Sequence, residues 1–377
     1  MEREFDVVLF GATGYTGRLT ARYLAEHGPA GLRWAIAGRS KEKLEAVGVD
    51  IPMLVADSSD PDSIFALVAR TRVVITTVGP YLEVGEALVK AAAEAGTDYV
   101  DITGEPEFVD LMYVRYHDVA KRTGARLVHA CGFDSAPHDI GAFYTAQQLA
   151  ATGAVEMKGV VRSTGGVSGG TFASALGQFA RFRTMRTTAR ERRAAEGRFA
   201  RGHHKLGGIQ RSRELGVWML PLPTIDPQIV VRSAEALPVY GSSFTYGHYA
   251  GVRRTLTVAL TLVGIPFLLL LAQVGPARRW LAAKLPQGTG PSDDVRAKAA
   301  FTVDYVATGD GRSIHTRITG PDPYDVTAAF AAETALSLLF DDNPPASGQV
   351  TTAAAVGDAL LARIQKAGMT FEVIGRP

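Results

Sequence analysis

Three glycines close to the amino end of the chain are spaced for binding a phosphate group. Glycine lets a turn bring its backbone close to a ligand, and a helix that starts in such a turn presents free N–H groups and a positive dipole end to an anion. An apolar run precedes these glycines and a helical pattern follows them. The pattern predicts a dinucleotide pyrophosphate site, and a plain strand-to-helix turn is the simpler alternative. The candidate residues are Gly11, Thr13, Gly14, Tyr15, Thr16 and Gly17.

A basic residue stands where such a site would hold the adenosine ribose. Arg39 and Ser40 follow the second apolar run, about 20 residues beyond the glycines. An acidic residue there would bind the 2′-hydroxyl of NAD, whereas a guanidinium can hold the 2′-phosphate of NADP through two hydrogen bonds. We therefore predict NADP(H) as cofactor; the alternative is that Arg39 caps a helix or pairs with Glu42. Asp57 could contact the adenine side of the cofactor or cap the next helix.

A cofactor of this kind exchanges a hydride, so the protein must polarise the acceptor and supply a proton. Tyr81, Asp134 and Ser135 follow later apolar runs and are the candidate catalytic residues, with His138 as a further proton donor. Each has a structural alternative. Asp134 and Ser135 could cap the following helix, and Tyr81 could stack on the nicotinamide ring.

The elements that must position these residues alternate along the chain. Apolar runs begin near residues 5, 33, 52, 73, 98 and 126, and helical segments separate them. This alternation predicts an α/β fold with a Rossmann-type, doubly wound parallel sheet over residues 1–150. Ligands of such sheets lie beyond the carboxyl ends of the strands, so Val78, Gly79 and Pro80 are expected near the nicotinamide ribose.

The remaining residues do not continue this alternation. Residues 155–162 alternate as a strand with one exposed face would, and an Asp-Gly pair at 310–311 predicts a hairpin. We expect an α+β substrate domain over residues 151–348, and a C-terminal helix and strand over residues 349–377.

Composition limits the location and the chemistry of the protein. The chain has 377 residues, a formal net charge of +2 and one cysteine, Cys131, which excludes an internal disulfide. His203 and His204 have no visible third ligand, so no metal site is predicted. The charged amino end leads directly into a strand and predicts no secretory signal. We expect a cytoplasmic protein, with peripheral contact to the inner face of the cell membrane as an open alternative.

Two segments of the expected substrate domain stand out. Residues 181–213 hold eleven Lys/Arg against two acidic residues, a net charge of +9. They form either a solvated surface or a surface for acidic lipid head groups, an acyl carrier or a phosphorylated substrate; no nucleic-acid-binding motif accompanies them. Residues 256–274 carry no charge. Gly264 and Pro266 interrupt them, so we consider membrane-surface contact, a buried wall of an acyl tunnel, and a membrane span.

Six short motifs are found at residues 11–17, 37–40, 77–81, 98–105, 130–135 and 352–361. Together they resemble the motifs of the saccharopine dehydrogenase-like oxidoreductases, and within that family they are most similar to the actinobacterial trans-acting enoyl reductases. The resemblance implies an NADP(H)-binding Rossmann domain, an α+β domain that covers the nicotinamide, and a C-terminal end that packs back near the first domain. It also implies reduction of a carbon–carbon double bond in a polyketide-derived acyl chain during cell-wall lipid assembly. No paired-arginine site for two amino-acid carboxylates is visible, which argues against saccharopine as substrate.

Two hypotheses of different classes follow. The first is an NADPH-dependent trans-acting enoyl reductase that acts on a polyketide or lipid acyl chain, either free or on a carrier protein. The second is a membrane-associated NADP(H)-binding sensor or scaffold without turnover. The sequence does not indicate the oligomeric state.

Overall fold

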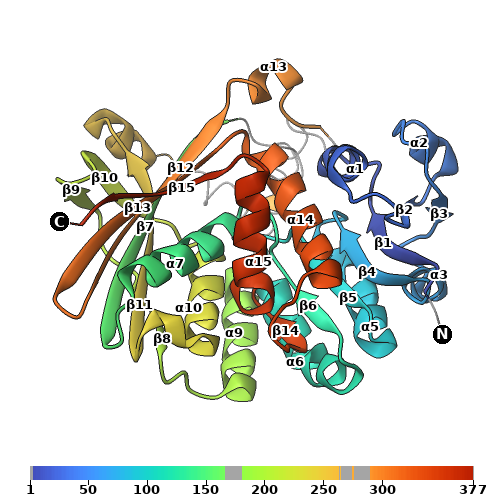
Figure 1. The fold of residues 1–377 in the computed structure, drawn as a ribbon, viewed down its shortest axis with the longest axis horizontal. Coiled ribbons are helices and arrows are strands. Elements are labelled where there is room, and N and C mark those ends of the chain that lie inside the picture. The colour runs from blue at the N-terminus through green and yellow to red at the C-terminus, as the bar shows by residue number, and fades with distance from the viewer. Residues whose placement is uncertain (1–2, 166–180, 263, 265–273, 276–288, 377) are drawn as a thin grey trace. The chain divides into compact units, whose positions relative to one another are not determined.

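The computed structural model describes residues 3–165, 181–262, 264, 274–275 and 289–376 (Figure 1). The chain forms two compact units, and each consists of several segments. Unit 1 comprises Met1–Ala136, Thr188–Ala195 and Tyr324–Ala367. Unit 2 comprises Pro137–Thr187, Glu196–Pro323 and Gly368–Pro377. These bounds differ from the three consecutive domains expected from the sequence, because C-terminal segments return to both units.

Unit 1 is built on a seven-stranded parallel sheet with the strand order β14-β6-β5-β4-β1-β2-β3. Six of its strands follow the expected apolar runs in an order that reverses at β1, which is the arrangement of a dinucleotide-binding fold. The β1 strand is buried over its whole length, consistent with cover on both faces. The predicted Rossmann-type sheet is thus confirmed. The strands are β1 (Phe5–Phe10), β2 (Trp34–Gly38), β3 (Met53–Val55), β4 (Thr71–Thr76), β5 (Asp98–Asp101), β6 (Arg126–Val128) and β14 (Gly348–Val350).

Some helices of unit 1 begin or end at capping residues. Asp60 accepts hydrogen bonds from the N–H groups of Asp62 and Ser63 and so starts α3. Gly124 takes the left-handed conformation, with φ 84°, and ends α6. The helices are α1 (Tyr15–His27), α2 (Lys41–Glu45), α3 (Pro61–Val68), α4 (Tyr81–Val84), α5 (Glu86–Ala95), α6 (Pro106–Thr123), α14 (Pro323–Phe340) and α15 (Thr352–Lys366).

Unit 2 is built on a mixed sheet in the order β15-β13-β12-β7-β11-β10-β9, and β8 pairs with β11. The predicted hairpin is present: β12 and β13 are joined by Asp310 and Gly311, which both have positive φ. The second α+β domain is confirmed as a fold class. Its strands are β7 (Ala154–Thr164), β8 (Gly202–His204), β9 (Gln210–Ser212), β10 (Val217–Pro221), β11 (Ser243–Val252), β12 (Ala300–Gly309), β13 (Arg312–Gly320) and β15 (Thr370–Gly375).

Two helices cover one face of this second sheet. The hydroxyl of Tyr305 donates to the carbonyl oxygen of His138 in α7 at 2.9 Å, and α10 packs along β11. Tyr305 and His248 both lie opposite Gly159 in the strand register, so they share that face. The helices of unit 2 are α7 (Ala136–Leu149), α10 (Asp226–Ala236), the 3-10 turn η1 (Pro238–Tyr240) and α13 (Asp293–Arg296).

The basic residues 181–213 form α9 (Phe182–Glu196), β8 and β9 and the turns between them. They are not a uniformly solvated surface. Arg192 is buried and its guanidinium forms an ion pair with Asp110 at 3.1 Å within unit 1. Several others remain exposed, among them Arg190 and Arg193.

The apolar segment 256–274 lies mostly outside the described residues, because 263 and 265–273 are not part of them. Among the helices that the structure describes, none has the length and apolar character needed to cross a bilayer.

Candidate functional site

The turn between β1 and α1 can be built only with glycine at two of its three glycine positions. Gly11 has φ +93°, and a Cβ there would lie 2.6 Å from the Val78 Cγ2. A Cβ on Gly17 would lie 2.1 Å from the carbonyl oxygen of Gly11. At Gly14 the nearest atom would be 3.4 Å away, an ordinary contact. The turn therefore keeps its first and third glycines close to the backbone, which leaves room above it for a phosphate.

The first turn of α1 suits an anion. Gly14 is the N-cap residue, and no acidic residue lies in the first helical turn. Thr13, Tyr15 and Thr16 are half-buried, so part of each remains accessible at the helix start. The N-terminal N–H groups and the helix dipole favour negative charge here. These residues fit the pyrophosphate of a dinucleotide.

Three candidate residues follow β2 and β3. Arg39 is an exposed cation, whereas Ser40 and Asp57 form hydrogen bonds that stabilise local turns. Arg39 is exposed, and its charge contributes to the lowered pKa of Asp57. The larger causes of that lowered pKa are hydrogen bonds from the backbone N–H and the hydroxyl of Ser59, at 2.9 and 2.8 Å. The Oγ of Ser40 accepts a hydrogen bond from the N–H of Lys43 and caps α2. Arg39 is thus the exposed cation among these three residues.

The loop after β4 lies against the glycine turn. The hydroxyl of Thr77 donates to the carbonyl oxygen of Gly11 at 3.1 Å, and the N–H of Val78 donates to the Oγ1 of Thr76. Val78 and Pro80 are half-buried, and Gly79 between them is exposed. The expected nicotinamide-side loop therefore lies next to the expected pyrophosphate turn.

The hydroxyl of Tyr81 forms hydrogen bonds with backbone groups of the protein. It donates to the carbonyl oxygen of Thr76 at 3.0 Å and accepts from the N–H of Ile102. Burial raises the pKa of Tyr81 well above its usual value, and the charge of Asp101 adds to this shift. The contacts made by this side chain connect the ends of β4 and β5.

Two buried acidic residues order the ends of β4, β5 and β6, and the sequence analysis did not single them out. Asp101 accepts hydrogen bonds from the Tyr99 hydroxyl, from Nδ1–H of His129 at 2.6 Å, and from two backbone N–H groups. Glu105 accepts from the N–H groups of Tyr81 and Leu82 at the start of α4. The available sequence signal was an acidic residue at the last position of a buried strand, followed four residues later by a second one.

Asp134 and Ser135 lie in the loop after β6. The nearest contact of a Cβ on Gly104 would be the Oδ2 of Asp134, at 2.8 Å, so the loops after β5 and β6 meet there. The Asp134 side chain is accessible to solvent, yet surrounding protein desolvates it and raises its pKa. Ser135 is fully buried, and its Oγ has no hydrogen-bond partner among the described residues.

The sheet of unit 1 thus brings the site residues predicted from the sequence to the carboxyl ends of its parallel strands.

Residues 7–159 match the family described as Saccharopine dehydrogenase NADP binding domain. A trans-acting enoyl reductase of Mycobacterium bovis is 34% identical to this chain, over 98% of this chain and 98% of its own length. The chain belongs to the trans-acting enoyl reductase family. It is accordingly an NADP(H)-dependent oxidoreductase.

Further relatives agree with this assignment, and one solved structure shares the fold. A trans-acting enoyl reductase of Mycobacterium ulcerans is 33% identical, over 98% of this chain and 97% of its own. A Mycobacterium tuberculosis protein, given the same activity provisionally in its name, is 38% identical with the same coverage. The apo saccharopine dehydrogenase (L-Glu forming) of Saccharomyces cerevisiae has a similar fold, with a TM-score of 0.58, 12% identity, and coverage of 98% of this chain and 100% of that chain.

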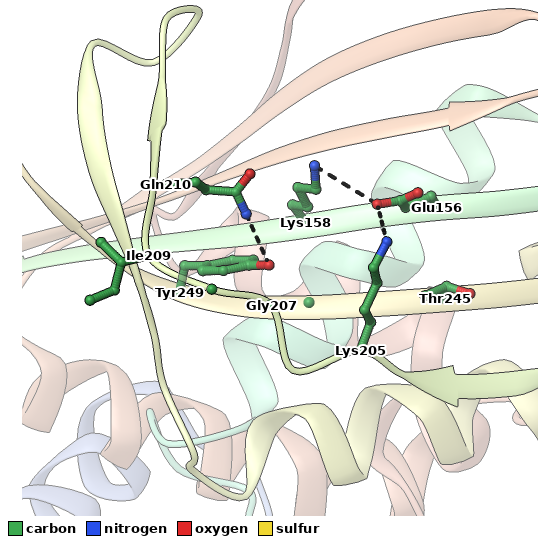
Figure 2. Close-up of a pocket in the computed structure, with 10 residues that line it drawn as sticks. Glu156, Lys158, Lys205, Gly207, Ile209, Gln210, Thr245 and Tyr249 are labelled. Carbon is green, nitrogen blue, oxygen red and sulfur yellow. Dashed lines mark hydrogen bonds and ion pairs between the residues drawn. The ribbon is translucent and has the colours of Figure 1, made fainter.

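This enoyl reductase family member also has a polar pocket of about 290 Å³ on the open face of the unit 2 sheet (Figure 2). Glu156 lies between Lys158 and Lys205, and its Oε1 is 3.8 and 3.5 Å from their ammonium nitrogens. Opposite them, the amide of Gln210 donates to the hydroxyl of Tyr249 at 3.3 Å. Because Glu156 neutralises part of the lysine charge, the pocket has only a weak preference for anions.

Proposed function

We propose that this chain is an NADPH-dependent trans-acting enoyl reductase that saturates a carbon–carbon double bond of a polyketide or lipid acyl chain. The observation that carries the proposal is the likeness to proteins named trans-acting enoyl reductase over nearly the full length of both chains. The alternative, an NADP(H)-binding sensor or scaffold without turnover, is not favoured, because the named relatives are enzymes.

In this proposal the residues of unit 1 hold the dinucleotide along one edge of the sheet. The turn from Gly11 to Gly17, with the first N–H groups of α1, binds the pyrophosphate. Arg39 binds the 2′-phosphate, and Ser40 and Asp57 shape the turns beside it. The loop of Val78, Gly79 and Pro80 contacts the nicotinamide ribose. When bound, the cofactor supplies a hydride to one carbon of the double bond.

The other carbon of the double bond needs a proton, and we propose that Asp134 supplies it. Its raised pKa keeps the carboxyl protonated to higher pH than an ordinary aspartate. Its access to solvent allows the proton to be replaced after each turnover. Ser135 follows it in the chain, and this buried residue is proposed to position the loop that carries Asp134. Tyr81 is proposed as a positioning residue, because its hydroxyl already contacts the carbonyl oxygen of Thr76.

The acyl substrate is proposed to reach the enzyme on a carrier protein or at the membrane surface. The net charge of +9 in residues 181–213 and the uncharged residues 256–274 are the features that suggest it. Both an acidic carrier and anionic lipid head groups would be attracted by exposed residues such as Arg190 and Arg193.

The proposal is tested by turnover of the purified full chain. NADPH and unsaturated acyl thioesters of several lengths are supplied, free and on an acyl carrier protein. We expect NADPH oxidation that depends on the acyl chain, together with a product heavier by two hydrogens. If NADPH binds but no thioester in the series is reduced, the non-catalytic alternative takes its place.

A further inference from the structure

Unit 2 contains a buried group of nitrogen and oxygen donors that the proposed function does not use. His138 lies in the first turn of α7, Asp226 is the first residue of α10, and His248 lies in the middle of β11. Their side chains are 3%, 3% and 1% exposed. The three therefore converge from two helix starts and the covered face of the sheet.

Two of the distances within this group are close to those between ligands of one metal ion. The Nε2 of His138 lies 3.4 Å from Oδ1 of Asp226, and the Nε2 of His248 lies 3.7 Å from Oδ2. All three ligand atoms lie within 4.8 Å of one another. Zinc bonds of about 2.0–2.2 Å in a tetrahedral site place neighbouring ligands roughly 3.3–3.6 Å apart. Both separations also exceed the usual length of a hydrogen bond to a carboxylate, about 2.7–2.9 Å.

The surroundings orient the imidazole of His248 toward the carboxylate. The Nδ1 of His248 lies 3.0 Å from the Tyr246 hydroxyl, which leaves its Nε2 directed at Asp226. The imidazole rings of His138 and His248 meet edge to face, with an interplanar angle of 74°, so these two rings are not stacked. A hydrogen bond on the second ring nitrogen is the usual outer-shell support of a metal-binding histidine.

The chemistry of the three donors also suits a metal ion. Two imidazoles and one carboxylate are a donor set typical of zinc sites that keep an open position.

We propose that His138, Asp226 and His248 bind one divalent transition-metal ion, with Zn²⁺ as the best fit, and leave a fourth position for water. The carboxylate would offset part of the charge of the ion inside the protein. The sequence predicted no metal site because its only visible histidine pair was His203 and His204.

The first test uses the full chain without an affinity tag, produced in zinc-supplemented medium and dialysed. Mass spectrometry of the metals should find about one zinc per chain. Protein exchanged into Co²⁺ should show the intense visible absorption of four-coordinate cobalt. Removing the metal with dipicolinate should lower the melting temperature, and adding zinc should restore it. No retained zinc, no cobalt band and no effect of zinc on melting would overturn the proposal in favour of a polar cluster without metal.

Variants locate the site. Asp226→Asn and His248→Gln keep the side-chain size and should lose the bound metal, and Tyr246→Phe should weaken binding about 10–100-fold. His315→Gln is the matched control: His315 is also buried in unit 2 and its Nε2 lies 2.8 Å from Oδ1 of Asp304, outside the cluster. The control should retain zinc. Retention of zinc by both Asp226→Asn and His248→Gln would place the metal elsewhere and overturn the proposal. Should a variant fail to fold, the wild-type experiments still decide.

Discussion

Gly104 and Asp134 meet where the loops after β5 and β6 approach each other, and a Cβ on Gly104 would come within 2.8 Å of the Asp134 Oδ2. Gly104→Ala should therefore displace the carboxylate that we propose as proton donor. We expect kcat to fall about tenfold or more, since small misplacements of a catalytic group are costly. NADPH affinity should stay the same. Gly208→Ala, where no heavy atom lies within 4 Å of the added Cβ, is the control and should keep full activity.

Asp134 should give the reaction a pH dependence. Because desolvation raises its pKa, the carboxyl is protonated below the raised value and loses its proton above it. The rate of the chemical step should fall as pH rises through that value. Asp134→Asn should lower kcat about 10²–10⁴-fold and remove this limb of the pH profile. Asp118→Asn, at an exposed position of α6, should change neither. An unchanged pH profile in Asp134→Asn would assign the proton to another group.

Arg39 should determine the choice between NADPH and NADH. A hydrogen bond to a charged group contributes about 1.5–3 kcal/mol, so Arg39→Ala should weaken NADPH binding roughly 10–100-fold. NADH binding should hardly change, because NADH lacks the 2′-phosphate. Fluorescence titration of both nucleotides measures the effect, and Arg22→Ala, an exposed arginine on α1, is the control. Equal losses for both nucleotides would contradict the assigned role.

The glycine turn allows a matched pair of substitutions. In Gly17→Ala the added Cβ would lie 2.1 Å from the Gly11 carbonyl oxygen, whereas in Gly14→Ala its nearest contact is 3.4 Å. Gly17→Ala should therefore distort the turn and reduce NADPH affinity more than tenfold, and Gly14→Ala should have a much smaller effect. Isothermal titration of the two variants compares them directly. Similar affinities for both would show that the turn is not the phosphate site.

Asp101 should be important for stability. Asp101→Ala would remove a fully buried carboxylate and leave Nδ1–H of His129, the Tyr99 hydroxyl and two backbone N–H groups without their acceptor. The loss of a buried charged partner costs about 3–5 kcal/mol of unfolding free energy. Chemical denaturation measures it. Glu4→Gln, in an exposed ion pair with Arg70, should be nearly neutral.

The sequence could predict the strands and helices of unit 1, because a local pattern of apolar and polar residues determines them. Alternating apolar runs and helical segments predict parallel strands, and parallel strands place Gly11, Val78 and Asp134 at the same edge. The proposed metal-binding group could not be predicted in this way. His138, Asp226 and His248 are far apart in the sequence, and their approach depends on the register between β7, β11 and β12 and on the packing of two helices.

The role of Tyr81 shows a second limit of sequence reasoning. The position just past β4 is a good place for a catalytic hydroxyl, and the sequence does not reveal which way the side chain points. Here the chain continues into α4, and the ring is buried beside Phe108 with its hydroxyl on a backbone carbonyl. The direction of a side chain at a strand end depends on the loops around it, and these come from distant segments.

The place of β14 in the first sheet has a consequence for how the chain folds during synthesis. This strand pairs with β6 through residues 348–350, more than 200 residues after β6 itself. Until the ribosome has made that segment, β6 remains an open edge with unpaired backbone groups, which can pair with another nascent chain. The amino-terminal half therefore emerges first but finishes its sheet late, and its edge is open to mispairing in the meantime.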